Sequence, residues 1–239
     1  MFLRKEINNT PKHIGIIIDG NGRWARQRGE TRSYGHQKGA KQLYSIVELS
    51  VQLAIEYLTV YVFSKENWQR PKDEVGSLMN LFEKGLDMDN LLIKNNIRLL
   101  IVGDLRGLPT SVGEHLTKCI QRTQTNTGMT LCLALNYSSR LEIVHATKQL
   151  AEKVSNKIIR INDISEQLIS KYLYTYPMPD IDFLIRTGGE YRLSNFMLWQ
   201  CSYAELYFCK TLWPDFKEKD YLKAIYEYQK RDRRFGKIK

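Results

Sequence analysis

The sequence predicts one α/β domain built on a mostly parallel sheet with helices on both faces. Short apolar runs rich in β-branched residues alternate with longer stretches of helical periodicity, which is the pattern of strands joined by helical crossovers. The 239 residues, 43% of them apolar, are enough for one large core. Because no Pro/Gly/Ser-rich linker or internal repeat divides the chain, we expect a single domain over residues 1–239.

Five apolar runs predict the strands of the sheet. Each run is short and consists mainly of Ile, Val, Leu, Phe or Met, as expected for strands buried on both faces. In chain order, the predicted strands are 14–18, 58–63, 97–102, 129–135 and 181–185. The segments 196–200 and 204–208 predict one or two further short extended pieces.

The stretches between these runs predict helices. Pro71 excludes helix just before it, so the polar segment 64–74 is expected to be a loop. Pro109 and Thr110 provide a helix start. In chain order, the predicted helices are 37–57, 74–95, 110–125, 140–154, 163–174 and 217–232.

The composition gives no sign of a membrane-spanning, secreted or zinc-binding protein. No apolar run approaches the length of a membrane span, and the first residues lack the apolar core of a signal peptide. We expect residues 1–12 to form a flexible arm. The cysteines show neither a CxxC pair nor zinc-type spacing, which predicts reduced thiols in a cytoplasmic protein; they are Cys119, Cys132, Cys201 and Cys209.

The net charge of +10 is concentrated at the C terminus. Residues 230–239 hold six cations and one acid, a net charge of +5, and residues 233–239 form a basic tail. The other notable arginines stand singly in loops with Gly, Ser, Asn or Trp. A nucleic-acid surface more often shows a continuous basic stripe. The distribution therefore favours a small, highly charged anion as ligand, and we expect no nucleic-acid partner.

The most informative stretch is His13–Ala25, HIGIIIDGNGRWA. A buried strand ends there on the carboxylate of Asp19, and a turn follows that carries two glycines and Arg23. A carboxylate suits a hard cation, glycines let backbone N–H groups approach anionic oxygens, and arginine binds phosphate as a fork. The residues by themselves predict a magnesium-dependent phosphate or diphosphate site, without naming the reaction.

Two further loops add to this site. Ligands of parallel sheets lie beyond the carboxyl ends of the strands. The loop after the second strand supplies Ser64, Asn67, Trp68 and Arg70, and the loop after the fifth supplies Arg186, Arg192 and Ser194. We expect these side chains to converge with Asp19 at one end of the sheet.

The predicted helix 74–95 has an unusually wide apolar face. Its apolar residues between 78 and 93 cover about half of the circumference at 100° per residue, more than a helix packed on a sheet requires. Either deep burial or an oligomer contact explains this width. The other interpretation is that this face forms the wall of an apolar tunnel.

The motifs, taken together, resemble those of the cis-prenyltransferases, most closely the bacterial undecaprenyl diphosphate synthases. HIGIIIDGNGRWA is followed in the family's order by RSYGHQKG, FSKENWQRP, RTGGEYRLSNFMLWQ, YAELYF and WPDF, and RRFG closes the series. The resemblance extends from about His13 to Gly236. It implies a parallel six-stranded sheet with an apolar product tunnel, and a homodimer. The implied reaction is repeated Mg²⁺-dependent addition of isopentenyl diphosphate to an allylic diphosphate such as farnesyl diphosphate.

The resemblance also implies roles for individual residues. Asp19 matches the catalytic aspartate that holds Mg²⁺, Glu205 a second carboxylate linked with Mg²⁺, and Asn67 the position assigned as proton acceptor. Arg234-Phe235-Gly236 resembles an element that reaches a neighbouring subunit's diphosphate. The implied substrate-binding residues are Gly20, Asn21, Gly22, Arg23, Trp24, Arg32, His36, Ser64, Lys65, Glu66, Trp68, Arg70, Arg186, Arg192, Leu193 and Ser194.

Two features depart from the family pattern. Ser138 and Ser139 replace the commoner glycine pair in the segment NYSSR, and Lys65 stands where a small residue is common.

An amide is barely basic, so our hypothesis is that Asn67 orients the substrate while a diphosphate oxygen or water accepts the proton. Read without the resemblance, Asp19 could cap a helix, Asn67 could serve a turn and Trp68 could anchor the core.

Several functions compete at this point. The first is a synthase that makes undecaprenyl diphosphate, the carrier lipid of cell-wall synthesis, or a cis-polyprenyl diphosphate of another length. The second is a non-catalytic partner subunit, which would lack the aspartate and the arginines that are present here. The third is a basic nucleic-acid binder, although no basic–aromatic interleaving appears. We expect a cytoplasmic dimer, with peripheral contact at the inner membrane surface where a greasy product would leave.

Overall fold

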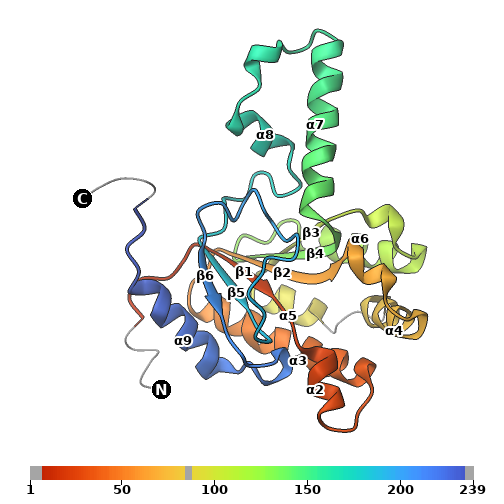
Figure 1. Ribbon diagram of the computed structural model, residues 1–239, viewed down its shortest axis with the longest axis vertical. Coiled ribbons are helices and arrows are strands. Elements are labelled where there is room, and N and C mark those ends of the chain that lie inside the picture. Colours follow the sequence, from red (N-terminus) through yellow and green to blue (C-terminus); the bar gives the residue numbers. More distant parts are fainter. Residues whose placement is uncertain (1–6, 84–87, 235–239) are drawn as a thin grey trace.

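The computed structural model of the chain describes residues 7–83 and 88–234. Its centre is a six-stranded sheet in the order β3-β4-β2-β1-β5-β6, in which every neighbouring pair is parallel (Figure 1). This confirms the predicted fold class. The strands are β1 (His13–Ile17), β2 (Tyr57–Ser64), β3 (Arg98–Val102), β4 (Thr130–Tyr137), β5 (Phe183–Arg186) and β6 (Glu205–Phe208).

Helices follow most strands, as the alternating pattern predicted. They are α2 (Asn21–Arg26), α3 (Arg32–Gln52), α4 (Lys72–Glu83), α5 (Met88–Lys94), α6 (Thr110–Thr123), α7 (Ser139–Ser155), α8 (Glu166–Tyr172) and α9 (Glu218–Gln229). Short 3₁₀ turns occupy Lys65–Gln69 (η1), Leu105–Gly107 (η2), Ile161–Asp163 (η3) and Trp213–Asp215 (η4).

The two faces of the sheet are covered differently. On one face, strand residues such as Ile14 and Ile16 pack with Leu43 and Ile46 of α3 and with residues of α5, α6 and α9. On the other face, Ile17 and its neighbours pack against Phe196, Met197 and other residues between 174 and 204. The apolar cover of the second face therefore comes mainly from an irregular segment, whereas the sequence analysis expected helices on both faces.

Helices α7 and α8 form an arm that projects from the sheet (Figure 1). Its base is fixed by the buried carboxylate of Glu142, which accepts hydrogen bonds from the Tyr137 hydroxyl (2.5 Å), the Tyr174 backbone N–H (2.7 Å) and the Gln200 side chain (3.2 Å). Burial raises the pKa of Glu142. Three donors on one buried carboxylate hold the arm in a defined position on the sheet.

Both ends of the predicted helix 37–57 were wrong. Helix α3 begins at Arg32, where the Thr31 hydroxyl accepts the Tyr34 backbone N–H, and it ends at Gln52. The expected turn after Asp19 is instead the short helix α2. A Cβ on Gly35 would lie 2.2 Å from the Asn21 carbonyl oxygen, so this glycine permits α2 and α3 to approach closely. Glycine lowers helix propensity, which hid the first turns of α3 in the sequence.

The segment 196–200 is not extended, contrary to prediction. Ser194, Asn195 and Met197 have φ of 50°, 62° and 44°, which lie in the left-handed region and are incompatible with a strand. Phe196 and Met197 are apolar because they are buried in the core under the sheet. The other expected piece, 204–208, is confirmed as β6.

The predicted helix 74–95 corresponds to α4 and α5, on either side of residues 84–87, which lie outside the described residues. Leu78, Met79 and Phe82 of α4 are buried against β2, β4 and α6. The predicted N-terminal arm is described from Ile7 onward, and Ile7 packs on the core. Within the described part of the chain, no helix combines the length and apolarity that membrane crossing requires.

Candidate active site

A cavity of about 430 Å³ opens beyond the carboxyl ends of β1, β2 and β5. Six arginines and two carboxylates line it, so a polyanion suits it. Thirteen of the predicted site residues lie in its wall: Asp19, Gly20, Asn21, Gly22, Arg23, Arg32, His36, Ser64, Asn67, Arg70, Arg186, Arg192 and Ser194. The convergence of three loops, expected from the rule for parallel sheets, is therefore confirmed.

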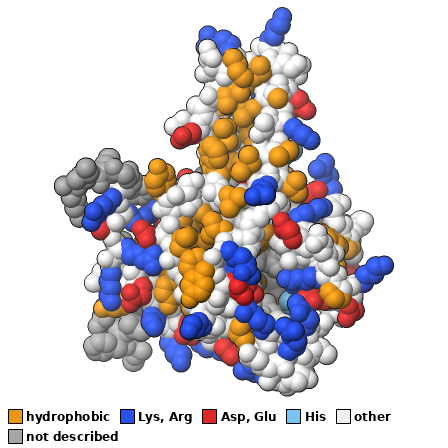
Figure 2. All heavy atoms as spheres, viewed as in Figure 1, with side chains coloured by type: hydrophobic (Ala, Val, Ile, Leu, Met, Phe, Trp, Pro, Cys, Tyr) orange, Lys and Arg blue, Asp and Glu red, His pale blue; other side chains and the backbone are white. Residues whose placement is uncertain are grey.

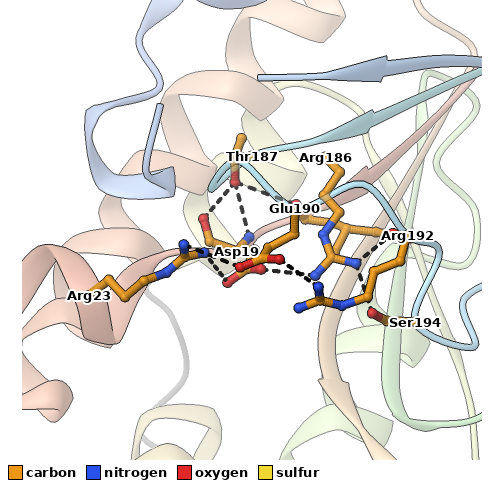
Figure 3. A network of polar contacts seen from close by, with 8 residues as sticks. Asp19, Arg23, Arg186, Thr187, Glu190, Arg192 and Ser194 are labelled. Atoms are coloured by element: carbon orange, nitrogen blue, oxygen red, sulfur yellow. Dashed lines mark hydrogen bonds and ion pairs between the residues drawn. The ribbon is translucent and has the colours of Figure 1, made fainter. Parts of the chain in front are cut away.

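Asp19 lies between two arginines (Figure 3). Its Oδ2 accepts a hydrogen bond from Arg186 Nη2 at 2.9 Å, and its Oδ1 lies 3.3 Å from Arg23 Nη2. The backbone of Asp19 is fixed by Thr187, whose hydroxyl donates to the Asp19 carbonyl oxygen at 2.7 Å. Gly20, not Asp19, occupies the position before α2, and no side chain caps that helix. The helix-cap interpretation of Asp19 is therefore wrong.

Arg186 joins Asp19 to the loop that follows β5. Its guanidinium is almost fully buried, with 4% of the side chain exposed. Nη1 donates to the Ser194 hydroxyl at 2.7 Å and to the Arg192 carbonyl oxygen at 2.5 Å (Figure 3). One planar side chain thus sets the positions of the carboxylate and of the 192–194 turn.

Glu190 also lies in this network, although the sequence analysis did not select it. Its carboxylate is 2.5 Å from Arg192 Nη1 and 3.5 Å from Arg23 Nη1 (Figure 3). In this geometry Glu190 holds two flexible arginine side chains over the cavity beside Asp19. Its position in the RTGGEY motif was the available signal.

A second cluster forms around Glu74, another residue that the sequence analysis did not select. Its carboxylate contacts Arg32 Nε at 2.7 Å, and His36 Nε2 and Arg70 Nη1 at 3.1 Å each. The pKa of Glu74 lies below its usual value. Burial acts to raise this pKa, but hydrogen bonds from His36 and Arg32 lower it by more. Glu74 therefore positions three predicted diphosphate ligands, Arg32 and His36 from helix α3 and Arg70 from the loop after β2.

Burial favours the neutral form of His36 in this cluster. Burial lowers its pKa despite the neighbouring Glu74 carboxylate. Because an ionised carboxylate only accepts hydrogen bonds, Nε2 must carry the proton that is donated to Glu74. Nδ1 of His36 is then an acceptor.

The loop after β2 carries Asn67 and Trp68. The Asn67 side-chain oxygen accepts the Ser64 backbone N–H at 3.0 Å and closes the turn η1. Trp68 donates to Asn136 at 2.8 Å and packs edge-on against Phe63, with ring centroids 5.2 Å apart. Trp68 is thus an anchor that fixes this loop on the sheet, in agreement with the structural interpretation from the sequence.

Six predicted residues do not line the cavity: Trp24, Lys65, Glu66, Trp68, Leu193 and Glu205. Trp24 is buried beside Tyr34, with the Arg28 guanidinium 4.1 Å from its ring centroid. Leu193 packs on the core under the sheet. The pKa of Glu66 lies below its usual value. Limited burial acts to raise this pKa, but a hydrogen bond from Asn195 helps to lower it.

Glu205 lies at the opposite end of the sheet from Asp19. It begins β6 and pairs in register with Phe183, which pairs with Ile14, whereas Asp19 follows Ile17. At about 3.3 Å per residue, the two carboxylates are more than 10 Å apart along the strands. Within one chain, therefore, the two carboxylates cannot hold the same cation. Glu205 instead binds Arg231 Nη1 at 2.8 Å.

The donor set fits Mg²⁺ bound through one carboxylate. Mg²⁺ is commonly held by one or two carboxylates together with substrate phosphates and water. The described residues contain no group of three His, Cys, Asp or Glu side chains arranged for a metal. Asp19 projects into the cavity among arginines that would bind a diphosphate, so the remaining ligands would come from that substrate and from water.

Comparisons with known proteins agree with this geometry. The family model described as putative undecaprenyl diphosphate synthase matches residues 17–236. The chain is 47% identical over 230 residues to a ditrans,polycis-undecaprenyl-diphosphate synthase from Pasteurella multocida, covering 96% of each chain. It is 48% identical to an isoprenyl transferase from Clostridium perfringens, covering 97% of this chain and 92% of the relative.

Two solved structures of prenyl diphosphate synthases have a similar fold. Lavandulyl diphosphate synthase from Lavandula x intermedia, in complex with dimethylallyl diphosphate, superposes with a TM-score of 0.93 at 39% identity, covering 95% of this chain and 99% of that one. A probable undecaprenyl diphosphate synthase from Campylobacter jejuni gives 0.79 at 34% identity, covering 96% and 100%. The chain is therefore an enzyme of the prenyltransferase family that contains the undecaprenyl diphosphate synthases.

Proposed function

We propose that the enzyme adds isopentenyl diphosphate repeatedly to farnesyl diphosphate and releases a long cis-polyprenyl diphosphate. The observation that carries this proposal is the cavity in which six arginines surround Asp19. Two diphosphates bring several negative charges together, and fixed guanidinium groups offset that charge without reorganisation. The cis-prenyltransferase relatives bearing undecaprenyl diphosphate synthase in their names support the choice of reaction.

We assign the two ends of the cavity to the two diphosphates. Arg192 and Ser194, held by Arg186, form one anion site, and Arg32, His36 and Arg70, held by Glu74, form the other. We assign the first site to isopentenyl diphosphate and the second to the allylic diphosphate, and Asp19 and Arg23 lie at the first. Mg²⁺ bound at Asp19 would supply a Lewis acid that offsets diphosphate charge where the two substrates meet.

Asn67 acts by orientation in this proposal. Its carbonyl oxygen is engaged by the Ser64 backbone N–H, so it holds the loop rather than accepts a proton. A stereospecific proton loss that fixes the cis double bond then requires another acceptor, a diphosphate oxygen or water. An Asn67→Ala variant with full turnover and unchanged stereochemistry would rule out this role.

The product is proposed to be undecaprenyl diphosphate. This choice is supported by the names of relatives that align over nearly the whole chain. Product identity needs a direct measurement, because a structure with 39% identity and the same fold is named lavandulyl diphosphate synthase. We place the growing chain along the apolar face of α4, where Leu78, Met79 and Phe82 meet Phe63 of β2.

The first experiment is incorporation of labelled isopentenyl diphosphate with farnesyl diphosphate and Mg²⁺, followed by chain-length analysis. Long cis product that disappears with EDTA and in Asp19→Ala supports the proposal. Arg28→Ala is the control, because Arg28 stacks on Trp24 and does not line the cavity. Folded enzyme that makes no polyprenyl product from these substrates would overturn the proposal and favour a non-catalytic partner subunit.

We also propose a homodimer formed through the arm. Figure 2 shows hydrophobic side chains in a strip along it. Leu141 and Val144 are 51% and 48% exposed, and Ile158 and Ile161 near the tip are 63% and 67% exposed. A surface of this kind on one copy fits the same surface on another. Sedimentation should give a dimer that Val144→Glu weakens; a monomeric wild type would contradict the proposal.

In this dimer, Glu205 and the C-terminal tail are proposed to serve the neighbouring subunit. Arg231 binds Glu205, and Arg233 binds Asp182 at 2.5 Å, so the base of the tail is fixed at the amino ends of β5 and β6. Phe235 and Gly236 lie outside the described residues. Mixing inactive Asp19→Ala with inactive Arg234→Ala subunits should restore activity if the tail completes its partner's site.

The greasy product leads us to propose peripheral contact with the inner membrane surface of the cytoplasm. The basic groups of residues 230–239 suit an anionic lipid surface. Anionic phospholipid vesicles should accelerate steady-state turnover if product release is limiting. Unchanged turnover with bound vesicles would contradict this contact.

A further inference from the structure

Asn195 lies where three segments of the site meet. Its side-chain Nδ2 donates to Glu66 Oε1 of η1 at 2.8 Å and to the Ser138 hydroxyl at the start of α7 at 2.7 Å. Its Oδ1 accepts the Arg140 backbone N–H at 3.0 Å. Asn195 directly follows Ser194, whose hydroxyl binds Arg186. One carboxamide therefore joins the loop after β2, the base of the arm and the turn that carries Arg192 and Ser194.

These contacts fix the orientation of the carboxamide. A backbone N–H can only donate, so the atom that faces Arg140 is the oxygen and the atom that faces Glu66 is the nitrogen. The Asn195 backbone carbonyl also accepts the Ser139 N–H at 3.0 Å. Asn195 has φ of 62°, a left-handed conformation that asparagine adopts more readily than most residues.

The contact between Asn195 and Glu66 helps to set the positions of Ser64 and Asn67 in the cavity wall. Glu66 lies in the same short turn as Asn67, whose side chain closes that turn on Ser64. Ser64 and Asn67 both line the cavity, whereas Glu66 and Asn195 do not. A shift of η1 relative to the 192–194 turn would therefore move Ser64 and Asn67 relative to Ser194.

Ser138 strengthens this junction in a way particular to this sequence. Its hydroxyl oxygen accepts hydrogen bonds from Asn195 Nδ2 and from the Leu141 backbone N–H. Ser138 therefore caps α7 and at the same time fixes the side chain of Asn195. Glycine, the commoner residue here, has no hydroxyl for either bond. The serine substitution therefore adds a bond to the junction.

We propose that Asn195 is a positioning residue that fixes the Ser64–Arg70 segment relative to the Arg192–Ser194 turn, through Glu66 on one side and Ser138 on the other. Asn195 does not itself line the cavity. The inference rests on the substrate site proposed above, so Asp19→Ala is measured in the same assay. An active Asp19→Ala would refute that site, whereas the outcomes below concern Asn195 alone.

The experiment reverses the polarity of the Asn195–Glu66 hydrogen bond. Asn195→Asp keeps the shape and the acceptor for the Arg140 N–H but places a carboxylate against Glu66. Glu66→Gln in that background supplies an amide that donates to the new carboxylate. We expect Asn195→Asp to lower kcat/KM for isopentenyl diphosphate about tenfold or more, and the double variant to recover at least about fivefold.

Thermal unfolding of each variant separates positioning from folding. The double variant should recover kcat/KM relative to Asn195→Asp even though the two proteins have similar melting temperatures. A purely structural role of Asn195 does not predict such a recovery. Independent, multiplicative effects of the two substitutions would overturn the proposal, as would wild-type kinetics in Asn195→Asp. If Asn195→Asp does not fold, Glu66→Ala and Ser138→Ala remove the two acceptors separately. Each should then lower kcat/KM severalfold, and two unchanged values would overturn the proposal.

Discussion

Replacing Arg186 with lysine keeps a positive charge beside Asp19 but removes the planar fork that reaches three partners. Arg186 Nη2 binds Asp19 at 2.9 Å, while Nη1 binds the Ser194 hydroxyl and the Arg192 carbonyl oxygen. A lysine ammonium is a single point on a flexible stem. It can remain near Asp19 only by giving up the bonds to the 192–194 turn.

The expected loss follows from these two bonds. A hydrogen bond from a charged donor contributes about 1.5–3 kcal/mol, so losing two costs about 3 kcal/mol at the lower bound. These bonds also exist in the free enzyme, so their loss reaches kcat/KM through misplacement of Arg192 and Ser194. A misplacement of about 1 Å can cost about 100-fold, so kcat/KM for isopentenyl diphosphate should fall roughly 100-fold. Burial leaves little water to replace the lost partners, because only 4% of the side chain is exposed.

The assay is steady-state incorporation of labelled isopentenyl diphosphate at saturating farnesyl diphosphate. Arg28→Lys is the matched control. Arg28 pairs with Asp215 at 3.0 Å but is 42% exposed, and an exposed pair contributes about 0–1 kcal/mol. A folded Arg186→Lys enzyme within threefold of wild type would refute the fork argument, because the single charge would then suffice.

Two further predictions concern stability. Burial lowers the pKa of His13 to about 4 from a usual 6.5. Between these values the unfolded chain binds more protons than the folded chain, so the free energy of unfolding should decrease by up to about 3 kcal/mol as pH falls from 6.5 to 4. Urea titrations should show this slope, and His13→Gln should flatten it; an equal slope would contradict the assignment. Gly20 has φ of 117°, and a Cβ there would lie 2.9 Å from Leu212 Cα, so Gly20→Ala should destabilise by about 1–3 kcal/mol. Gly113→Ala, in α6 with nothing within 4 Å, should stabilise by about 0.5–1 kcal/mol, and equal melting shifts would contradict the argument.

The strands and the cavity end of the sheet were predictable because both depend on local patterns. A short buried strand in a parallel sheet is apolar along its whole length, so the run 14–18 predicts β1 to within one residue. Asp19 and Arg186 follow such runs directly. Parallel strands place their carboxyl ends at the same edge of the sheet, so the shared edge of these two residues was predictable. Their direct contact depends on the pairing of β1 with β5, which only the folded structure shows.

Helix boundaries were less predictable, because tertiary contacts decided them. Gly35 weakens the local helix signal, yet the close approach of α2 to α3 requires it. The apolar residues of 196–200 resemble a strand, but the backbone there follows left-handed turns that bury Phe196 and Met197. A pattern of apolar residues records burial, and burial can be reached by more than one backbone path.

The sequence by itself determined the family, the sheet and most of the residues that line the cavity, because motifs and apolar periodicity are local properties. Only the tertiary structure decided which groups hold those residues. Glu74, Glu190 and Asn195 look like ordinary polar positions until residues distant in the chain become their partners. The register likewise separates Glu205 from Asp19. Coulombic and hydrogen-bonding energies depend on distances between atoms, and distances between remote segments exist only once the chain has folded.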